Sequence, residues 1–340
     1  MSGVNTPSAP DSGHSAGWLP AFLVNAVIWG ASFLFIKYGV LEMPAMWVGA
    51  GRVVLGALTL IVIMLFLRER LPRDPKMWAY LLVPGVVGIA IPFSLFPLGE
   101  ERVPSLVAGI WNATTALWVL PFAVFVFRTE RFSVRGAAGL GLGFAGVLTV
   151  LGVWHTQGSA LTGQLMCGAA AFCYGISIPY IKRFATGRGV SGISIAAGQT
   201  IVAAIAIVPA ALISDGLPPA PSALSWKAIG SVLALGVFGS GVAFALNMRV
   251  ISRAGASTTA FVTYLVPLVS TTLGIVVLHE SLTWNQPVGA LIVLGGVAVA
   301  QGLVRPLRRA RGRKPSAGLL AEPAVEPALS GGSVAFAPRK

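Results

Sequence analysis

Polar and aromatic side chains recur at helical spacing within otherwise apolar stretches of this chain of 340 residues. Asn25, Trp29 and Ser32 stand at i, i+4 and i+7, so they share one face of a helix. Arg52 is the only formal charge deep within any of these stretches, and its guanidinium stays protonated at that depth. Apolar and aromatic walls with a few hydrogen-bonding groups are typical of small-molecule sites, so the pattern indicates non-covalent binding.

Later stretches carry side chains of the same kinds. Trp111 and Trp118 are seven residues apart and share a helical face. The candidate binding residues are Asn25, Trp29, Ser32, Arg52, Trp111, Asn112, Thr115, Trp118, Tyr174, Ser177, Phe261 and Tyr264. Helix packing is the alternative role, because small polar residues also let helices approach closely. For Arg52 the alternative is a structural guanidinium that donates to backbone carbonyls at a helix break.

The same stretches contain no His, Asp or Glu, so they lack the acid, base or ligand cluster of a catalytic or metal site. We therefore expect no enzyme activity, cofactor or metal. Cys167 and Cys173 are six residues apart on one predicted helix, and no disulfide follows from them. Proton-driven carriers often keep an acid inside the membrane, so its absence argues against proton antiport. The acidic residues fall at or near the predicted outer ends: Glu42, Glu100, Glu101, Asp215 and Glu280.

The composition places these stretches in a membrane. Apolar residues make up 55% of the chain and charged residues only 10%, against about 25% charged in a soluble domain. A helix needs about 20 apolar residues to cross a bilayer. Continuous apolar runs of this length predict helices and not the alternating strands of a barrel. We expect an all-α membrane protein with ten transmembrane helices, at 19–36, 44–67, 78–96, 104–127, 136–154, 162–181, 193–213, 226–248, 255–278 and 285–304.

The net charge of +13 is unevenly placed. Most Lys and Arg residues fall in alternate loops, while the other loops hold only Lys37, Arg102 and Lys227. The positive-inside rule then predicts that the basic loops and both termini are cytoplasmic. The basic run 305–314 is interpreted as an anchor on anionic lipid and not as a nucleic-acid site. Residues 1–17 and the tail 305–340 are predicted to be disordered.

Short phrases recur in the second half of the chain. Trp29-Gly30-Ala31-Ser32 returns as Tyr174-Gly175-Ile176-Ser177, and Glu130 returns as Glu280. Gly88 and Phe93 return as Gly239 and Phe244, and Gln199 is the expected counterpart of Arg52. Two repeats, 18–154 and 160–304, would each hold five helices. Because five is odd, the second repeat enters the membrane from the opposite side, which predicts two inverted five-helix repeats.

These residues resemble the EamA family of the drug/metabolite transporter superfamily. The resemblance is carried by Trp29-Gly30-Ala31-Ser32, by Arg52, and by Pro267 thirteen residues before Glu280. It implies ten spans in two five-helix repeats, cytoplasmic termini, and export of small metabolites, often amino acids, or of toxic compounds. The first half departs from the pattern, because Leu117 stands where Pro267 has its equivalent and proline follows at Pro121.

We therefore expect a secondary transporter that exports an amino acid-like or drug-like metabolite across the inner (plasma) membrane by alternating access. A passive facilitator or channel is the alternative, and an intramembrane enzyme is disfavoured. Glu130 and Glu280 are interpreted as structural latches, stabilised by cations or by helix N-termini. The expected partners are a small-molecule substrate and the lipid bilayer, without nucleic acid. The glycines of 136–146 would support either a homodimer or packing within the chain.

Overall fold

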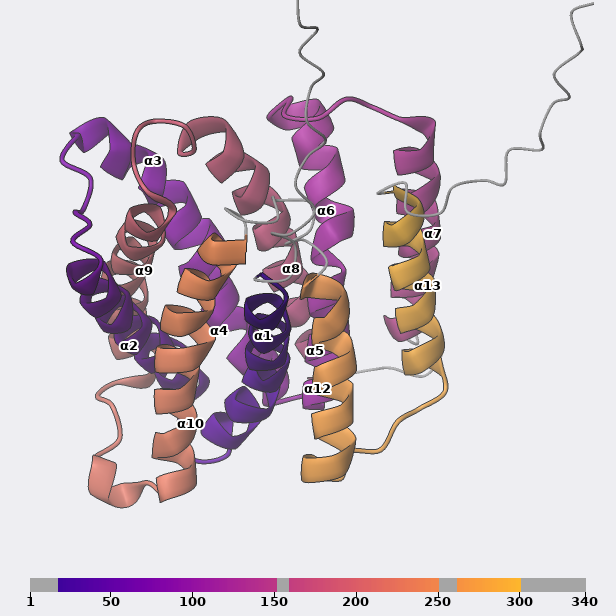
Figure 1. The fold of residues 1–340 in the computed structure, drawn as a ribbon. Helices are drawn as coiled ribbons and strands as arrows, with labels where there is room; N and C mark the ends of the chain where they lie inside the picture. The colour runs from indigo at the N-terminus through magenta and orange to yellow at the C-terminus, as the bar shows by residue number, and fades with distance from the viewer. Residues whose placement is uncertain (1–17, 152–158, 251–261, 301–340) are drawn as a thin grey trace, which may run out of the picture. The chain divides into compact units, whose positions relative to one another are not determined.

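The computed structural model describes residues 18–151, 159–250 and 262–300, and every regular element in these ranges is helical (Figure 1). The predicted disordered ends and Phe261 lie outside the described residues. The α-helices are α1 (Leu19–Val40), α2 (Ala45–Phe66), α3 (Pro75–Gly85), α4 (Ile91–Glu100), α5 (Ser105–Ala113), α6 (Thr115–Pro121), α7 (Val134–Leu151), α8 (Ser159–Phe184), α9 (Gly192–Asp215), α10 (Trp226–Gly236), α12 (Val262–Leu278) and α13 (Asn285–Ala300). The shorter elements are the π-helices η1 (Val86–Ala90), η2 (Phe122–Val126) and η4 (Val237–Val242) and the 3-10 turn η3 (Pro221–Ala223).

Among the described residues, seven helical segments are long and apolar enough to cross a membrane. They are Leu19–Val40, Ala45–Phe66, Pro75–Glu100, Ser105–Val126, Ala160–Phe184, Gly192–Asp215 and Trp226–Val250. Three further apolar helices are shorter: Val134–Val150, Leu265–Leu278 and Asn285–Val299. The prediction of an all-helical membrane protein is confirmed. The count of ten complete spans stays a prediction, because the shorter three have only 10–17 residues.

Capping side chains set several helix starts. Asp74, Ser191 and Ser225 precede α3, α9 and α10, and each accepts a hydrogen bond from a backbone N–H of the first turn. Some helix ends lie beyond the predicted apolar stretches. Helix α1 continues to Val40 and α4 continues to Glu100, so polar residues that follow the apolar runs still lie in helix.

Hydrogen bonds join several helix termini into one group, which we call the Glu280 end. Lys37 Nζ in the last turn of α1 donates to Val103 O at 3.2 Å. The Ser105 N–H at the start of α5 donates to Glu280 Oε1 at 2.7 Å. The turn between α1 and α2, the turn between α4 and α5, and the residues after α12 therefore meet at this end.

Glu42 ties the loop between α9 and α10 to the same end. Its carboxylate accepts hydrogen bonds from the Ser225 N–H at 2.8 Å and from Ser225 Oγ at 2.6 Å. These bonds lower the pKa of Glu42, with the Ser225 hydroxyl as the larger cause and the Ser225 N–H second. Nearby, Trp47 Nε1 donates to Gly216 O at 3.1 Å.

The opposite end of the helices is marked by Glu130, and we call it the Glu130 end. Helix α8 runs from one end to the other: a Cβ on Gly163 would lie 2.9 Å from Gly99 O, beside the α4–α5 turn. Near the other terminus of α8, Lys182 Nζ lies 3.5 Å from Glu130 Oε1. Glu130 and its counterpart Glu280 thus lie at opposite ends of the helices.

Helices α7 and α13 lie side by side in Figure 1 and are held together by glycines. A Cβ on Gly146 would lie 2.6 Å from Val293 N, and one on Gly296 would lie 2.5 Å from Gly143 N. The glycine face of 136–146 is therefore covered by α13 of the same chain. This agrees with the prediction that these glycines support packing within the chain. Backbones at this distance leave no room for a side chain.

Gly296→Ala should therefore destabilise the protein, because the new methyl group overlaps the backbone of α7. Overpacking of this kind costs about 1–3 kcal/mol. We expect a lower midpoint of thermal unfolding for the purified protein in detergent. Gly295→Ala is the matched control, since a Cβ there meets nothing within 4 Å. Equal melting temperatures for the two variants would contradict this packing.

Candidate functional site

A cavity of about 580 Å³ lies among α1, α2, α4, α5, α8 and α9, and it has the size of a small-molecule site. Both halves of the chain contribute to its wall. Its polar lining consists of Ser32, Arg52, Asn112, Thr115, Tyr174, Ser177, Thr186, Gln199 and Asn247. Its aromatic lining, besides Tyr174, consists of Trp29, Phe33, Phe93, Phe96 and Phe244.

Most of the predicted binding residues meet at this cavity. Those in its lining are Trp29, Ser32, Arg52, Asn112, Thr115, Tyr174 and Ser177. Phe261 and the side chain of Tyr264 lie outside what the structure describes.

Asn25, Trp111 and Trp118 are placed in contacts between helices and not in the lining. Asn25 is fully buried, and its Nδ2 donates to Asn247 Oδ1 at 3.4 Å. Trp111 Nε1 donates to Gln164 Oε1 at 3.2 Å. The ring of Trp118 makes edge contacts with Phe144 and Phe172, at centroid distances of 5.3 and 5.1 Å.

Arg52 makes the structural bonds that the sequence offered as one of its two roles, and it also lines the cavity. Its Nε donates to Ser240 Oγ at 3.2 Å and its Nη2 donates to Gly239 O at 3.4 Å. Both acceptors belong to η4, where the π-helical hydrogen-bond pattern interrupts the α-helical ladder. The guanidinium carbon also lies 4.0 Å from the centroid of the Phe93 ring, and the side chain lines the cavity. The helix break therefore fixes the cation at the cavity wall, where a cation–π contact adds to its stabilisation.

Glycines of one repeat pack against serines of the other in two equivalent places. A Cβ on Gly239 would lie 3.0 Å from Ser32 Oγ, and one on Gly88 would lie 2.1 Å from Ser177 Oγ. The two glycines are counterparts in the sequence repeats, and so are the two serines. Gly88 lies in η1 and Gly239 in η4, so the two π-helices also occupy equivalent positions. The close approach brings each serine to the cavity wall.

Sequence reasoning left several lining residues out of the site. Phe93 and Phe244 were recognised as a repeated pair, and Gln199 as the counterpart of Arg52, and all three line the cavity. The repetition of these positions in both halves of the chain was the signal that could have placed all three residues in the site. Asn247 carried no such signal, because its counterpart position holds an apolar residue.

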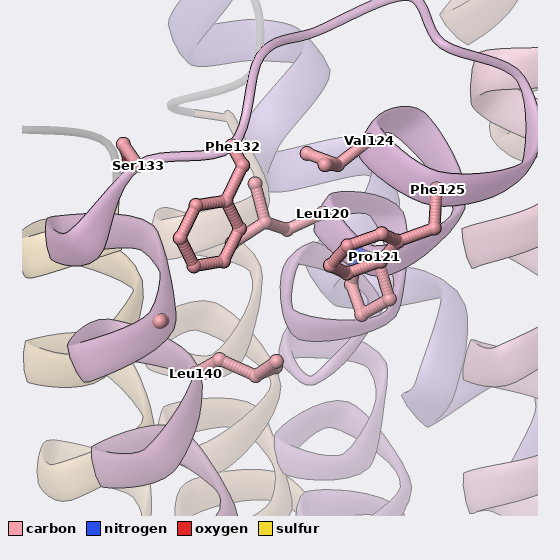
Figure 2. A pocket seen from close by; sticks show the side chains of 8 residues that line it. Leu120, Pro121, Val124, Phe125, Phe132, Ser133 and Leu140 are labelled. Atoms are coloured by element: carbon pink, nitrogen blue, oxygen red, sulfur yellow. The ribbon is translucent and has the colours of Figure 1, made fainter.

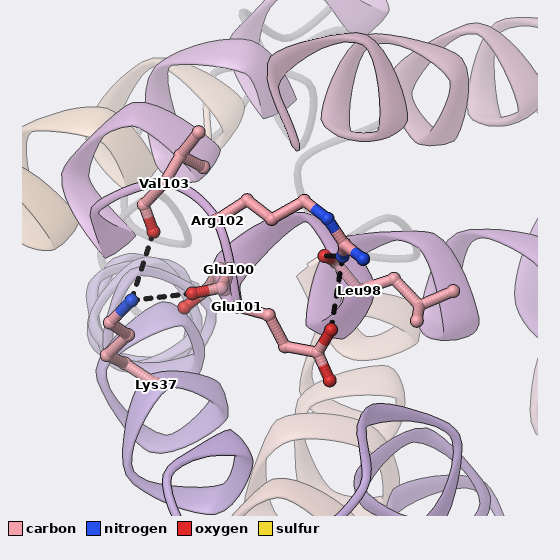
Figure 3. Close-up of polar contacts among 6 residues, drawn as sticks. All are labelled: Lys37, Leu98, Glu100, Glu101, Arg102 and Val103. Carbon is pink, nitrogen blue, oxygen red and sulfur yellow. Dashed lines mark hydrogen bonds and ion pairs between the residues drawn. The ribbon is translucent and has the colours of Figure 1, made fainter. Parts of the chain in front are cut away.

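The expectation that every carboxylate lies outside the spans is wrong for Glu100. This residue ends α4 within the span Pro75–Glu100, and its side chain is fully buried. The cause is Gly99, whose missing side chain lets α8 close over the last turn of α4: a Cβ there would lie 2.6 Å from Cys167 Sγ. Lys37 Nζ donates to the backbone carbonyls of Glu100 and Val103 at 2.5 and 3.2 Å (Figure 3).

The two repeated glutamates have the kinds of partner that were expected. Glu280 Oε1 accepts from the Ser105 N–H, and its Oε2 accepts from Ser105 Oγ and the Leu106 N–H, both at 3.1 Å. These donors form the N-terminus of α5, where a negative charge is stabilised by unpaired N–H groups and the helix dipole. Glu130 instead faces Lys182, and both of these side chains are largely exposed.

A second pocket, of about 50 Å³, lies between α6, η2 and α7 (Figure 2). Its lining is apolar except for Ser133, with Phe125 and Phe132 facing one another across it. This volume is too small for a metabolite, whose sites usually measure about 300–1,000 Å³. The larger cavity is therefore the candidate site.

Comparison with known families identifies the kind of protein. A model of the EamA-like transporter family matches residues 16–152 and again residues 161–301. The chain belongs to the EamA-like transporter family. This EamA protein is a membrane transporter of the drug/metabolite type, and its family architecture is the two-repeat one.

Its relatives are transporters by name. The EamA chain is 27% identical to the uncharacterized transporter YvbV of Bacillus subtilis over an alignment of 285 residues. This alignment covers 83% of this chain and 90% of that protein. It is 24% identical over 298 residues to a probable amino-acid metabolite efflux pump of Salmonella typhimurium, covering 85% and 96% of the two chains. A solved crystal structure with 19% identity has a TM-score of 0.61 and covers 86% of this chain and 99% of that chain, which shows the shared fold.

Glu280→Gln should destabilise this EamA protein, because it removes the negative charge from the N-terminus of α5. A lost cap costs about 0.5–2 kcal/mol, which thermal unfolding in lipid nanodiscs would detect. Glu130→Gln is the matched control: its ion pair is exposed and contributes about 0–1 kcal/mol. A larger loss of stability for the Glu130 variant would contradict the assignment.

Proposed function

We propose that this protein is a secondary transporter that exports a small, carboxylate-bearing metabolite by alternating access between two inverted repeats. The observation that carries the proposal is the cavity itself. Equivalent residues of both repeats line it, with Arg52 as a fixed cation among aromatic rings. A carboxylate would pair with the guanidinium, and the aromatic wall suits an apolar or aromatic side chain.

The inverted arrangement is supported by the repeated glutamates. Glu280 lies with the start of α5, while its counterpart Glu130 lies with Lys182 at the opposite end of the helices. The Glu130 end also carries most of the loop cations, including Arg68, Arg70 and Arg73. The positive-inside rule therefore supports a cytoplasmic Glu130 end, with both termini in the cytoplasm and the protein in the inner membrane. The repeats that exchange roles are 18–154 and 160–304.

A carrier accounts for the cavity better than an open channel does. Phe33 and Phe96 both line the cavity, and their rings make an edge contact at a centroid distance of 5.5 Å. The lining also reaches Thr186 and Val190, in the loop between α8 and α9 at the Glu130 end, and Gly192 at the start of α9. A cavity that reaches one end and is closed by packed rings toward the other fits one state of an alternating carrier.

Counterflow in proteoliposomes tests the transport mechanism. Vesicles preloaded with one amino acid should take up the same labelled amino acid faster than empty vesicles, because a carrier exchanges substrates. A panel of amino acids and of amines without a carboxylate identifies the substrate class. Uptake that preloading leaves unchanged would favour the facilitator or channel. Absence of uptake for the whole panel would remove the carboxylate-bearing class.

Arg52→Ala should lower the initial rate of exchange at low substrate concentration, because a charge-assisted bond to the substrate carboxylate is lost. Such a bond contributes about 1.5–3 kcal/mol, or about 10- to 150-fold in affinity. Arg52→Lys keeps the charge without the planar guanidinium, so its initial rate of exchange should fall between those of the wild-type protein and Arg52→Ala. Arg135→Ala, at an exposed position of α7, is the control for a lost cation. An Arg52→Ala variant that is folded and exchanges normally would leave Arg52 only its structural bonds to η4.

Single cysteines at Phe132 and Leu282, exposed residues beside Glu130 and Glu280, test the orientation. Cys167 and Cys173 are first replaced by serine. In intact cells an impermeant thiol reagent should label Leu282→Cys from outside, and Phe132→Cys only after the membrane is opened. Labelling of both from the same side would contradict the inverted repeats.

A further inference from the structure

Glu100 is a carboxyl group buried without partners. Its side chain is 0% exposed, and neither of its side-chain oxygens accepts a hydrogen bond from the residues that the structure describes. Glu101 beside it is exposed and lies 3.1 Å from Arg102 Nη1 (Figure 3). An ionised carboxylate in such surroundings costs many kcal/mol, and a group placed there takes up a proton instead. The burial therefore indicates that Glu100 is neutral in this conformation.

The neighbouring charges leave the Glu100 carboxyl unpaired. Lys37 donates to the backbone carbonyls at the end of α4, so its ammonium is bonded to main chain and not to the carboxyl. Glu280 adds a negative charge that disfavours a second one close by. Arg52 is bonded to η4. The titratable and charged groups that act on Glu100 are Lys37 of α1, Arg52 of α2, Cys167 of α8 and Glu280 after α12.

The position of Glu100 links it to the substrate cavity. Phe33 and Phe96 precede Lys37 and Glu100 by four residues on α1 and α4, which is about one helical turn. The two rings form the cavity wall toward the Glu280 end. Glu100 and Lys37 therefore lie one turn behind this wall, among the contacts that hold the Glu280 end closed.

We infer that Glu100 is a proton-binding residue, and that closing of the Glu280 end takes up one proton on its carboxylate from the medium on that side. When the end is open, water solvates the ionised carboxylate. On closing, an O–H bond forms between the carboxylate and a proton given up by a hydronium ion, and the water that remains is released. The inference rests on the proposed function in taking the closed end as one of two alternating states. The proton returns to the same medium when the end reopens, so a lower pH on that side favours the closed state.

Infrared difference spectroscopy of the protein in lipid, titrated with acid and base, tests the protonation state. The wild-type protein should show the carbonyl stretch of a protonated carboxyl group at neutral pH. Glu100→Gln should lose this band, and Glu101→Gln, the adjacent exposed carboxylate, should retain it. The absence of the band from the wild-type protein, or its survival in Glu100→Gln, would overturn the inference.

Cys167 reports the opening of the same end, because its buried thiol lies against the last turn of α4. In a Cys173→Ser background it is the one cysteine left. Its labelling by a small thiol reagent should rise with pH more steeply than in the same background with Glu100→Gln. The ratio of the Cys167 labelling rates without and with Glu100→Gln should change by up to about tenfold per pH unit, as uptake of one proton requires. The comparison removes the thiol's own ionisation, which both share, and Glu101→Gln should follow the parent.

Equal pH dependence with and without Glu100→Gln, or no labelling of Cys167 at any pH, would overturn the coupling. Neither measurement needs a transported substrate. Failure of counterflow would therefore remove the proposed transport function and leave the titration of Glu100 as measured. Normal counterflow with a pH-independent opening would instead remove the proton-binding role alone.

Discussion

The close approach of helices at glycines of η1, η4 and α2 is the constraint on which the rest of the site depends. A Cβ on Gly88 would lie 2.1 Å from Ser177 Oγ, which leaves no room for a side chain, and one on Gly239 would lie 3.0 Å from Ser32 Oγ. Gly56 of α2 and Gly241 of η4 bring these two elements together, with a Cβ on Gly56 only 2.6 Å from Ser240 Cβ, so that the Gly239 carbonyl and Ser240 hydroxyl meet the Arg52 guanidinium. A cation inside a membrane is costly unless protein groups satisfy it. The glycines thus make it possible to place a charge at the wall of the cavity.

The two ends of the helices are stabilised in different ways. At the Glu280 end, a carboxylate on the first turn of α5, an ammonium on the last carbonyls of α4 and the Glu42–Ser225 bonds join four connections between helices. At the Glu130 end, the corresponding glutamate has an exposed ion pair, which contributes little. Arg128, two residues before Glu130, and His279, directly before Glu280, both adopt left-handed backbone conformations, with φ of 52° and 53°. A left-handed residue thus precedes each glutamate where the helix before it ends, and the different partners of the two glutamates account for the difference between the ends.

The all-helical class, the two repeats and much of the cavity were predictable from the sequence. Apolar length is set by the bilayer, and repeated residues such as Trp29 and Tyr174 mark equivalent positions. The helix ends were not predictable in the same way, because polar residues continue a helix wherever a neighbour covers them. Glu100 is the example: its burial depends on Gly99 and on α8, which is distant in sequence. Trp111 and Trp118 show the converse, since a helical face shared by two tryptophans does not reveal whether a cavity or another helix lies opposite.

The π-helices η1 and η4 give the segments Pro75–Glu100 and Trp226–Val250 a freedom that regular helices lack. A π-turn holds one residue more than the α-helical pattern, and that surplus can migrate along the segment, each hydrogen bond being exchanged for its neighbour. Each such step rotates the intervening side chains by about 100° around the helix axis. Aromatic residues just beyond η1 and η4, Phe93 and Phe244, thereby turn toward or away from a bound molecule while the backbone groups stay hydrogen-bonded within the helix, as the surrounding lipid requires.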